Sequence, residues 1–473
     1  MMDIHELYTG NMRSTRTVGS EEEYPVVRKS DFHSLSREDI QKVFMSLIAD
    51  GWEEQRDHQT GRVSAVSKNV DGRPFKVTTD FGTGTLEVNY PVSQNLHEAE
   101  QDLRTNLSYL SKRLDENGFL ILGYGIQPVT NPGRDIVAEK GRYRTLEQRF
   151  WTREHCSFLE NVTDVHFHTI NASNQVHIGL KNEREAIEAV NLLNLASPAI
   201  IALMGNSPIW LNGRGLRYKD SRQIFWDWVV NVSQDKFRKG IPERIFNDLD
   251  DYIKQQLSFE PVLTARVENG EVHYYEVIGA KNLGEPVRTG NITVAEPGAI
   301  NRKIYDATGQ VRLIDGGTVK TIPIDFIDVL AHDSFSWYEA RLKAEYGTVE
   351  LRCCAQQLPG EQIVVPALAL GLIENLSGLQ KALSRFSLED ARTARINAIK
   401  YGLNASYDGT GIFDLIKGVL DVSREGLTQR GLGEEVYLEP LDRRLMDRKS
   451  PADIILDTYS RSGIPGIVEL TSI

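Results

Sequence analysis

The sequence predicts an α+β fold in which helices pack against an antiparallel sheet. Strand-like segments, in which apolar and polar residues alternate, dominate residues 18–180. Helical patterns dominate residues 361–473, after the strands, where they would cap the sheet or form its other layer. The buried strand predicted at 119–125 ends in glycines with no Gly-Lys-Ser/Thr after it, so it is not a P-loop.

Composition limits the class of protein. The chain has 473 residues without an internal repeat or a low-complexity linker, which favours one interleaved domain over residues 1–473. A net charge of −12 argues against a partner with a nucleic-acid backbone. Three cysteines, of which Cys353 and Cys354 are adjacent, exclude a disulfide framework and fit a reducing cytoplasm. The sequence shows neither a membrane-spanning apolar run nor a signal-peptide pattern, so a cytoplasmic protein is expected.

The first strong feature is an acidic strand predicted at about 18–28. It contains Glu21, Glu22 and Glu23 and continues into an apolar segment. On a strand, Glu21 and Glu23 point to one face and Glu22 to the other. Two carboxylates on one face repel each other unless protons or cations neutralise them, and divalent cations would do so. An exposed acidic edge strand is the alternative for this segment alone.

The next elements follow from caps and periodicity. Ser36, with Asp39 at the third helical position, predicts a capped helix. Ser93 predicts the cap of a helix over 93–117. Further strands are predicted at 62–68, 75–81 and 85–90, and further helices at 181–204, 361–384, 388–400, 411–430 and 450–460.

A second acidic pair is predicted within the hairpin of strands 75–81 and 85–90. If Thr83-Gly84 forms a two-residue loop, Asp80 and Glu87 fall directly opposite each other. Like charges in that arrangement are destabilising, which strengthens the metal hypothesis. The alternative is a strand-end aspartate beside an unrelated exposed glutamate.

Three histidines lie in a strand-like segment, residues 165–180. His166 and His168 have the spacing of a metal chelate on a strand face, but this spacing recurs by chance and a structural role is the stronger interpretation. His177 alternates with apolar neighbours and so lies on the face opposite to them. If that face is the acidic one, the His177 imidazole joins the ligand set.

Two later segments supply cations. Arg214, Arg217 and Arg222 cluster after a helix-breaking Asn-Ser-Pro and suit phosphate or carboxylate recognition, with surface salt bridging as the alternative. In the predicted strand Tyr346–Cys353, Glu350 and Arg352 share one face, as a metal ligand beside a phosphate contact or as a salt bridge. Between these segments, residues 260–325 predict a β-rich insertion or cover without clear chemistry.

Together these patterns predict one site. A sheet face with five carboxylates and one imidazole requires large pKa shifts or counterions. Two or three Mg²⁺ ions would neutralise it and clamp a polyphosphate, which predicts phosphoryl transfer without a P-loop. The candidate metal ligands are Glu21, Glu23, Asp80, Glu87, His177 and Glu350.

Short motifs also follow one another in a characteristic order. They are Gly19-Ser20-Glu21-Glu22-Glu23, Thr79-Asp80 with Glu87, Lys140-Gly141-Arg142-Tyr143, Asn206-Ser207-Pro208, Gly347-Thr348-Val349-Glu350-Leu351-Arg352 and Pro451-Ala452-Asp453-Ile454-Ile455-Leu456. In this order they resemble the glutamate–cysteine ligase superfamily of carboxylate-amine ligases, in particular its plant and proteobacterial branch. The resemblance covers nearly the whole chain and implies a glutamine-synthetase-like fold, in which an antiparallel sheet forms a concave active-site face and helices pack outside.

The resemblance also implies a reaction and roles. The side-chain carboxylate of glutamate attacks the γ-phosphate of ATP, and an amine, usually that of cysteine, captures the acyl phosphate, as in glutathione biosynthesis. The six candidate ligands would hold Mg²⁺, and Arg352, with Arg214 and Arg217, would contact the nucleotide. Arg222 would hold the α-carboxylate of the acid substrate or steady the acyl phosphate. A monomer or homodimer is expected, without a nucleic-acid or membrane partner.

Three alternatives stay open at this point. The same chemistry could serve another amino acid or amine in specialised biosynthesis. The chain could be a non-catalytic binding protein that retains the fold, although the intact acidic set argues against this. A phosphotransferase that acts on guanidine acceptors would share the same fold.

Overall fold

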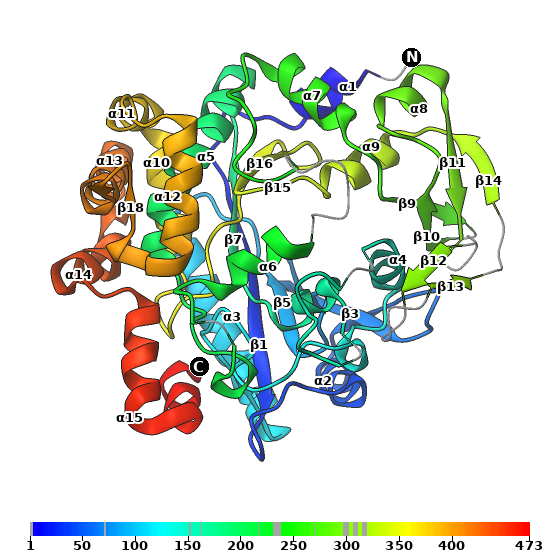
Figure 1. Cartoon of the computed structure of the whole chain (residues 1–473), viewed down its shortest axis with the longest axis horizontal. Coiled ribbons are helices and arrows are strands. Elements are labelled where there is room, and N and C mark those ends of the chain that lie inside the picture. Colours follow the sequence, from blue (N-terminus) through cyan, green and yellow to red (C-terminus); the bar gives the residue numbers. More distant parts are fainter. Residues whose placement is uncertain are drawn as a thin grey trace.

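The computed structural model describes residues 3–473 except 71, 151–152, 161, 216, 230–237, 269, 297–301, 306–310 and 315–318. Within these residues a nine-stranded sheet crosses the molecule, with β1 (Val18–Arg28) as its long central strand (Figure 1). The order across the sheet is β16-β17-β7-β1-β5-β4-β3-β2, and β6 pairs with β1 off this path. Neighbouring strands run antiparallel, so the predicted α+β class is confirmed.

The other strands of this sheet are short. Their bounds are β2 (Glu53–Arg56), β3 (Val63–Val70), β4 (Arg73–Thr79), β5 (Thr85–Asn89), β6 (Phe119–Ile121), β7 (Asn174–Gly179), β16 (Ala340–Lys343) and β17 (Thr348–Leu351).

The helices lie in the following ranges. They are α1 (Ile4–Thr9), α2 (Arg37–Ala49), α3 (Leu96–Glu116), α4 (Gly141–Arg149), α5 (Glu183–Met204), α6 (Ser221–Val229), α7 (Leu249–Ser258), α8 (Gly284–Thr289), α9 (Phe326–Asp333), α10 (Val364–Glu374), α11 (Leu376–Ala382), α12 (Leu388–Tyr401), α13 (Phe413–Arg430), α14 (Glu439–Asp447) and α15 (Pro451–Thr471). Short 3₁₀ segments include η1 (Arg134–Ile136), η2 (Asp164–Ile170) and η3 (Leu211–Gly213).

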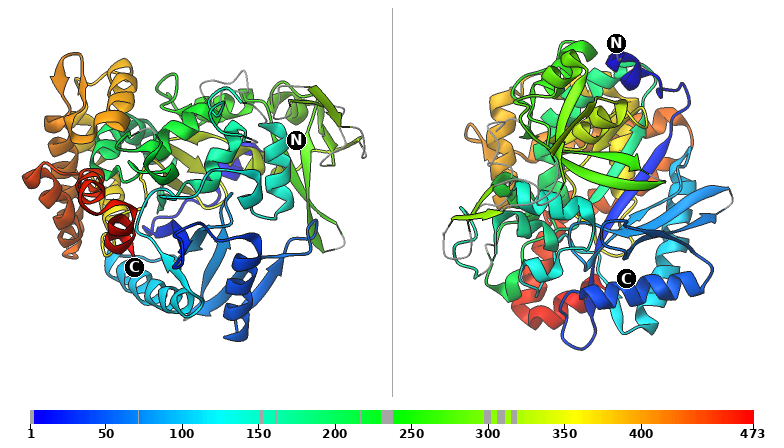
Figure 2. Two further views of the ribbon diagram at one scale, coloured as in Figure 1. Left: turned by 60° about the horizontal axis from the view of Figure 1, so that its bottom comes forward. Right: turned by 90° about the vertical axis from the view of Figure 1, so that its right-hand side faces the viewer.

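The two faces of the sheet differ because side chains alternate along each strand. One face is apolar and is covered by helices. Tyr24 and Val26 of β1 pack there with apolar residues of α2 and α3, which lie beneath the strands in Figure 2. Val176 of β7 and Val349 of β17 pack with residues of α5 and α10. The opposite face carries Glu21 and the other acidic side chains.

Several element predictions need correction. The cap at Ser36 is confirmed, because its side chain and that of Asp39 form a capping box at the start of α2. The second helix is capped by Asn95, not Ser93; Ser93 instead pairs with Val18 of β1 through its backbone. Residues 164–170 form the 3₁₀ segment η2 and not a strand, so the predicted shared strand face of His166 and His168 is wrong.

Helix α5 has the length and apolar composition of a membrane span. In its most apolar window, 78% of the residues are buried inside the protein. It packs against α12 and α13 on one side and against strands β16 and β17 on another. Its apolar composition therefore fits a core helix.

A second sheet lies in the region predicted as a β-rich insertion. It has the order β14-β11-β10-β9, and α4 packs beside β10 (Figure 1). Part of the predicted range, at 297–301, 306–310 and 315–318, lies outside the described residues. The remaining strands are β9 (Leu263–Glu268), β10 (Glu271–Val277), β11 (Asn291–Ala295), β14 (Val319–Pro323), β12 (Arg302–Tyr305), β13 (Val311–Ile314), β8 (Lys239–Gly240), β15 (Trp337–Tyr338), β18 (Ser406–Tyr407) and β19 (Thr410–Gly411).

An ion network joins the N-terminal segment to the C-terminal helices. Arg16, which precedes β1, binds Glu185 of α5 at 2.8 Å and Glu374 of α10 at 3.0 Å. Arg430 of α13 binds Glu374 from the other side at 2.8 Å. Burial raises the pKa of the Glu374 carboxyl, but Arg16 and the other cations outweigh it and lower that pKa to about 2.

This network predicts an acid-sensitive contribution to stability. Because the folded-state pKa of Glu374 lies below its ordinary value, its contribution is present above about pH 4.3 and is lost as the pH falls toward about 2. Glu374→Gln should therefore lower the free energy of unfolding at pH 7 by about 1–3 kcal/mol, less than for a fully dry ion pair. The deficit should shrink by pH 3 in urea titrations followed by circular dichroism. A deficit that is constant between pH 7 and pH 3 would contradict the role of its charge.

Candidate active site

A cleft of about 790 Å³ lies over the polar face of the nine-stranded sheet. The sequence-predicted residues that line it are Glu21, Glu23, Asp80, Glu87, His177, Glu350 and Arg352. They come from β1, β5, β7 and β17 and from the end of β4, over more than 300 positions of sequence. The structure therefore brings together all six candidate metal ligands and one of the predicted arginines.

Strand register explains how these side chains meet. Glu350 of β17 lies opposite His177 of β7, and His177 lies opposite Gly19 of β1. Glu23 of β1 lies directly opposite Glu87 of β5. This pair of facing carboxylates was not predicted.

The predicted direct pairing of Asp80 with Glu87 is wrong. Glu87 lies opposite Thr78, and the backbone of Asp80 bonds that of Thr85 at 3.0 Å. The loop is therefore longer than two residues, and the register differs from the predicted one by two positions. A shift of two keeps every side chain on its face, so Asp80 still lines the cleft beside Glu87.

The acids near β17 are compensated by cations. Arg341 of β16 donates from Nε to Glu350 at 2.7 Å, and Arg352 also contacts Glu350. Burial opposes ionisation of Glu350, but Arg341 and Arg352 hold its pKa well below the usual range. His177 Nε2 lies 3.6 Å from Glu21, whose pKa is lowered by this imidazole against the effect of burial.

The acids at the other end of the cleft are only partly compensated by nearby cations, and their pKa values are raised. Burial, together with Asp80 and Glu87, raises the pKa of Glu23 well above its ordinary value, although Arg222 and Ser173 oppose this shift. Burial and the charge of Glu21 raise the pKa of Glu87 to about 7. Burial also raises the pKa of Asp80 despite the nearby cation of Lys140. Glu23, Asp80 and Glu87 form what we call the acid triplet.

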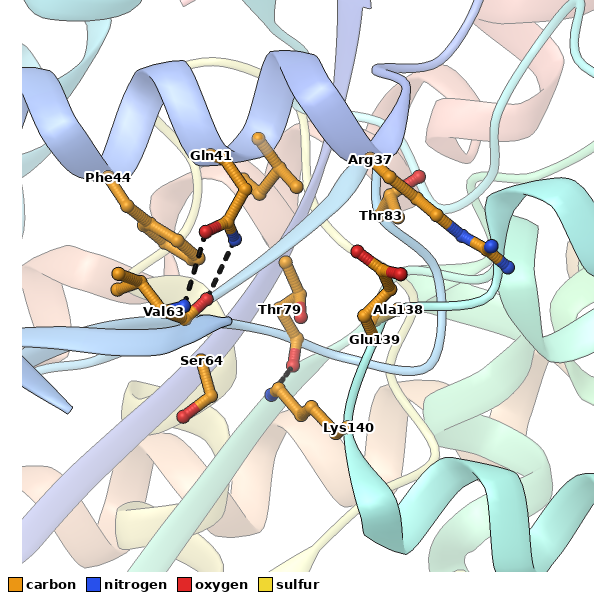
Figure 3. A pocket seen from close by; sticks show the side chains of 11 residues that line it. Arg37, Gln41, Phe44, Val63, Ser64, Thr79, Thr83, Ala138, Glu139 and Lys140 are labelled. Carbon is orange, nitrogen blue, oxygen red and sulfur yellow. Dashed lines mark hydrogen bonds between the residues drawn. The ribbon is translucent and has the colours of Figure 1, made fainter. Parts of the chain in front are cut away.

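Lys140, at the start of α4, faces the acid triplet. Its Nζ donates to Thr78 Oγ1 at 2.8 Å and also to the Thr79 carbonyl, and Figure 3 shows the second of these bonds. Burial lowers its pKa to about 8, although Glu87 and Asp80 favour the charged form. Neighbouring Arg142 and Tyr143 line the cleft, and Tyr143 Oη lies 3.4 Å from Asp80. The sequence signal for these residues was the Lys140-Gly141-Arg142-Tyr143 motif, to which no role was given.

A hydrogen-bond chain connects the two ends of the cleft. Arg352 Nη1 donates to Gln175 Oε1 at 2.7 Å, and Gln175 Nε2 donates to Glu23 Oε1 at 3.0 Å. The backbone N–H of Ser173 also donates to Glu23 at 2.8 Å. Arg352 and Gln175 therefore couple the compensated acids at β17 to the acid triplet.

The three arginines predicted in the 214–222 segment separate. Arg222 of α6 is 1% exposed and lies behind the cleft wall, where its Nη2 donates to the Arg352 carbonyl at 3.2 Å. Its Nε and Nη1 have no hydrogen-bond partner among the described residues. Arg214 and Arg217 are exposed and do not line the cleft, and Arg217 packs on the Tyr459 ring. Their assignment as nucleotide contacts is therefore not supported, because the loop directs them outward.

His168 is a cleft residue that the prediction treated as structural. The Asn171 amide lies 3.4 Å from its Nδ1, and its buried Nε2 has no partner among the described residues. Burial, with Arg222 and Arg352, lowers the pKa of His168 to about 3, so this imidazole is neutral where it lines the cleft. His166 instead bonds Glu147 at 2.9 Å, away from the cleft.

The opposite wall of the cleft is aromatic. Phe81, Tyr143, Phe150, Trp226 and Trp337 line it. The Trp226 ring lies 4.1 Å from that of His168 and 6.0 Å from that of Trp337, measured between ring centroids. The cleft therefore has a charged floor, made by the sheet, and an apolar wall, made by α4, α6 and neighbouring loops.

The donor set fits Mg²⁺. Most of its donors are carboxylate oxygens, and those of the acid triplet have raised pKa values, which a divalent cation would relieve. Among the described residues, no three of these cleft ligands have donor atoms within 4.8 Å of one another. Mg²⁺ retains several waters and is commonly held by one or two carboxylates plus substrate phosphates, so such spacing suits it better than a closed protein cage.

Comparison with known proteins gives a consistent result. A family model described as Glutamate-cysteine ligase family 2 (GCS2) matches residues 17–469. The chain is similar to chloroplastic glutamate–cysteine ligase A of Oryza sativa subsp. indica, with 22% identity over 388 residues that cover 80% of this chain and 68% of the plant protein. It is 27% identical over 135 residues to a Gloeobacter violaceus protein provisionally named glutamate–cysteine ligase 2; this match covers 28% of the chain and 33% of that relative.

A solved structure shows the same fold. The crystal structure of a glutamate–cysteine ligase from Francisella tularensis in complex with AMP aligns with a TM-score of 0.54 at 12% identity. The alignment covers 98% of this chain and 88% of that one. The family resemblance and the fold predicted from the sequence are thereby confirmed.

The repulsion within the acid triplet should destabilise the Mg²⁺-free protein, while the same carboxylates should favour the binding of Mg²⁺. Glu87→Gln removes one of two facing carboxylates and should stabilise the Mg²⁺-free protein by about 1 kcal/mol, or raise Tm by about 2 °C. Mg²⁺ should raise the Tm of the wild-type protein and raise that of the variant less. Differential scanning calorimetry at pH 8, with and without Mg²⁺, measures both effects.

The matched control for this prediction is Glu53→Gln on the exposed strand β2. It should leave both the Mg²⁺-free Tm and the Mg²⁺ increment unchanged. A Glu87→Gln protein that is less stable without Mg²⁺, with an undiminished Mg²⁺ increment, would contradict the proposed charge repulsion.

Proposed function

The chain belongs to glutamate–cysteine ligase family 2, and from this premise we propose that it is an ATP- and Mg²⁺-dependent ligase. In this proposal it forms an amide between the side-chain carboxylate of glutamate and the amine of cysteine. The observation that carries the proposal is the convergence of Glu21, Asp80, Glu350 and Arg352 on one cleft. A single catalytic domain is part of the proposal, supported by a hydrophobic core that contains residues from Ile4 to Leu441.

The floor of the cleft suits the binding of ATP phosphates. Bound Mg²⁺, held by the acidic set, would neutralise charge on the polyphosphate. Arg352 at the floor and Arg142 on α4 both line the cleft, where their guanidinium groups can donate to phosphate oxygens. Because phosphoryl transfer depends mainly on positioning and charge neutralisation, these residues supply what the first step needs.

The proposed reaction has two steps. A carboxylate oxygen of glutamate attacks the γ-phosphorus of ATP, the bond to the bridging oxygen breaks, and ADP leaves. The acceptor amine then attacks the carbonyl carbon of the acyl phosphate, and phosphate leaves as the amine loses a proton. The aromatic wall would limit water access, which protects an acyl phosphate from hydrolysis.

Arg222 is the proposed contact for the acid substrate. It is buried, and two of its nitrogens lack partners among the described residues, an arrangement that is costly unless a ligand satisfies them. It lowers the pKa of Glu23 and so acts on the acid triplet. A guanidinium in this position suits the α-carboxylate of glutamate or the oxygens of the acyl phosphate.

A second candidate is the same chemistry with a different amine. The aromatic side chains of the cleft wall favour it, because they offer more apolar contact than the side chain of cysteine can use. This candidate shares the floor and the acyl phosphate with the first, and the two differ only in the acceptor.

The deciding experiment measures product with a panel of acceptors. The purified protein, ATP, Mg²⁺ and glutamate are incubated with cysteine, with aromatic and aliphatic amino acids, or with simple amines. ADP release is coupled to a spectrophotometric assay, and the amide is identified by mass spectrometry. γ-Glutamylcysteine as the preferred product supports the first proposal, whereas preference for an apolar amine supports the second. No ADP release with any acceptor would refute both.

Glu350 gives a direct test of the acidic set. Glu350→Gln removes a ligand charge from β17 while keeping the volume of the side chain, and it should lower kcat by about 100-fold or more. The far-ultraviolet circular dichroism spectrum should remain that of the wild-type protein. Turnover at the wild-type rate would refute a role for the Glu350 carboxylate.

Arg222 is tested against Arg214. Arg222→Lys keeps the charge but loses the guanidinium fork, so kcat/KM for glutamate should fall by about 10–100-fold, with a smaller effect on the KM for ATP. Arg214→Lys, at an exposed position outside the cleft, should leave these constants unchanged. The opposite result, with Arg214 sensitive and Arg222 insensitive, would return the role to the exposed loop.

A further inference from the structure

Two imidazoles and a carboxylate converge outside the cleft. The ligand atoms of His58, Glu271 and His273 all lie within 4.8 Å of one another, and among the described residues no other group of three or more such side chains meets this limit. His58 Nδ1 contacts Glu271 Oε2, and the rings of His58 and His273 have centroids 4.4 Å apart. None of the three lines the cleft.

The cluster joins segments that are far apart in the sequence. His58 lies in the turn between β2 and β3, at one edge of the nine-stranded sheet. Glu271 and His273 lie two residues apart at the start of β10 in the second sheet, so their side chains share a face. The cluster therefore bridges the two sheets, and its three side chains are not close merely because they are neighbours in the sequence.

Other charges nearby are already engaged. Glu268 lies opposite Glu271 in the β9–β10 register, and its carboxylate binds Lys320 at 3.0 Å and Tyr275 at 2.8 Å. Arg266 lies opposite His273, but both of its Nη atoms donate to Asp328 at 2.7 Å. With these neighbours engaged elsewhere, the Glu271 carboxylate faces the imidazoles of His58 and His273, and the Glu268 carboxylate lies beside it.

We propose that His58, Glu271 and His273 form a binding site for Zn²⁺ or a chemically similar divalent transition metal. Two imidazole nitrogens and one carboxylate oxygen are a donor set that such metals prefer, whereas Mg²⁺ prefers oxygen ligands alone. Three protein ligands leave a position for water. The His58 and Glu271 side chains are 38% and 51% exposed, so a metal ion reaches them from solvent.

The position of the site gives it a structural consequence. The turn that carries His58 also holds the start of α4, because Asp57 Oδ2 accepts from the Gly141 backbone N–H at 3.0 Å and Thr60 Oγ1 donates to the Glu139 carbonyl at 3.0 Å. Gln59 Nε2 donates to the Tyr274 carbonyl of β10 at 3.3 Å. A metal bound here would fasten this turn to β10 and stabilise the segment that carries Arg142 and Tyr143 to the cleft.

The experiment is a metal titration of the chelator-treated whole chain in excess Mg²⁺, which is added to fill the proposed Mg²⁺ sites of the cleft. Isothermal titration calorimetry with Zn²⁺ should show one saturable site, and Zn²⁺ should raise Tm. Co²⁺ should give the visible absorption bands of a site with nitrogen ligands. His273→Gln and, separately, His58→Gln should weaken Zn²⁺ binding by about tenfold or more and remove the Tm increment.

Controls separate this site from the others. His33→Gln, at an exposed histidine elsewhere, should bind Zn²⁺ as the wild-type protein does. The melting curves of the two variants without metal show whether they fold, and either variant suffices for the test. Zn²⁺ binding of wild-type strength in both variants, or binding lost in Glu87→Gln instead, would overturn the proposal, as would the absence of saturable binding in the wild-type protein.

Discussion

The repulsion within the acid triplet is the constraint on which the rest of the structure depends. Glu23 and Glu87 face each other across β1 and β5, and Asp80 lies beside them at the end of β4. Each has a raised pKa, which means that the folded protein opposes the charged form of each. Clustered acids with raised pKa values are typical of functional sites, and here they mark the part of the cleft where a bound cation would be most favourable.

The apolar face of the sheet, which packs against α2 and α3, offsets the destabilising effect of the acid triplet. Alternation along β1 places Tyr24 and Val26 in a fully buried layer against α2 and α3, directly behind the acids. Glu22, between Glu21 and Glu23, is forced into the same layer, where burial raises its pKa to about 7 although the Tyr24 hydroxyl bonds it. The three consecutive glutamates thus place a destabilising carboxyl group on each face of the sheet. The burial of apolar side chains against α2 and α3 provides stabilising free energy that offsets this.

The sequence predicted best what depends on local periodicity. The acidic strand and the face shared by Glu21 and Glu23 follow from alternation alone, and the Ser36 cap from its local motif. The Asp80–Glu87 register failed by two positions because loop length sets register, and a five-residue connection between β4 and β5 replaced the assumed two. The strand character assigned to His168 failed because η2 satisfies its backbone locally.

What escaped sequence reasoning depends on long-range pairing. Arg341 binds Glu350 because β16 pairs with β17. The residues of β16 alone do not predict which strand it pairs with. Lys140 reaches the acid triplet through a loop-to-helix segment whose motif was noticed without a role. Arg214 and Arg222 are close in sequence, yet only the second lies on a helix that packs behind the cleft. Charged residues in a sequence are candidates for the site, and only the tertiary contacts show which of them lie at the cleft.

The division of the cleft into floor and wall explains why the class of reaction is better defined than its acceptor. The floor is made by paired strands, where a change of one side chain disturbs a network that extends from Arg341 through Glu350, Arg352 and Gln175 to Glu23. The wall is made by α4, α6 and loops, whose aromatic side chains contact one another, and Trp226 meets that network only by packing against the Arg352 guanidinium, 5.7 Å from its ring centroid, among the contacts of the described residues. A wall can therefore vary in shape while the floor keeps its charges, so family membership constrains the proposed acyl-phosphate chemistry more tightly than the proposed acceptor amine.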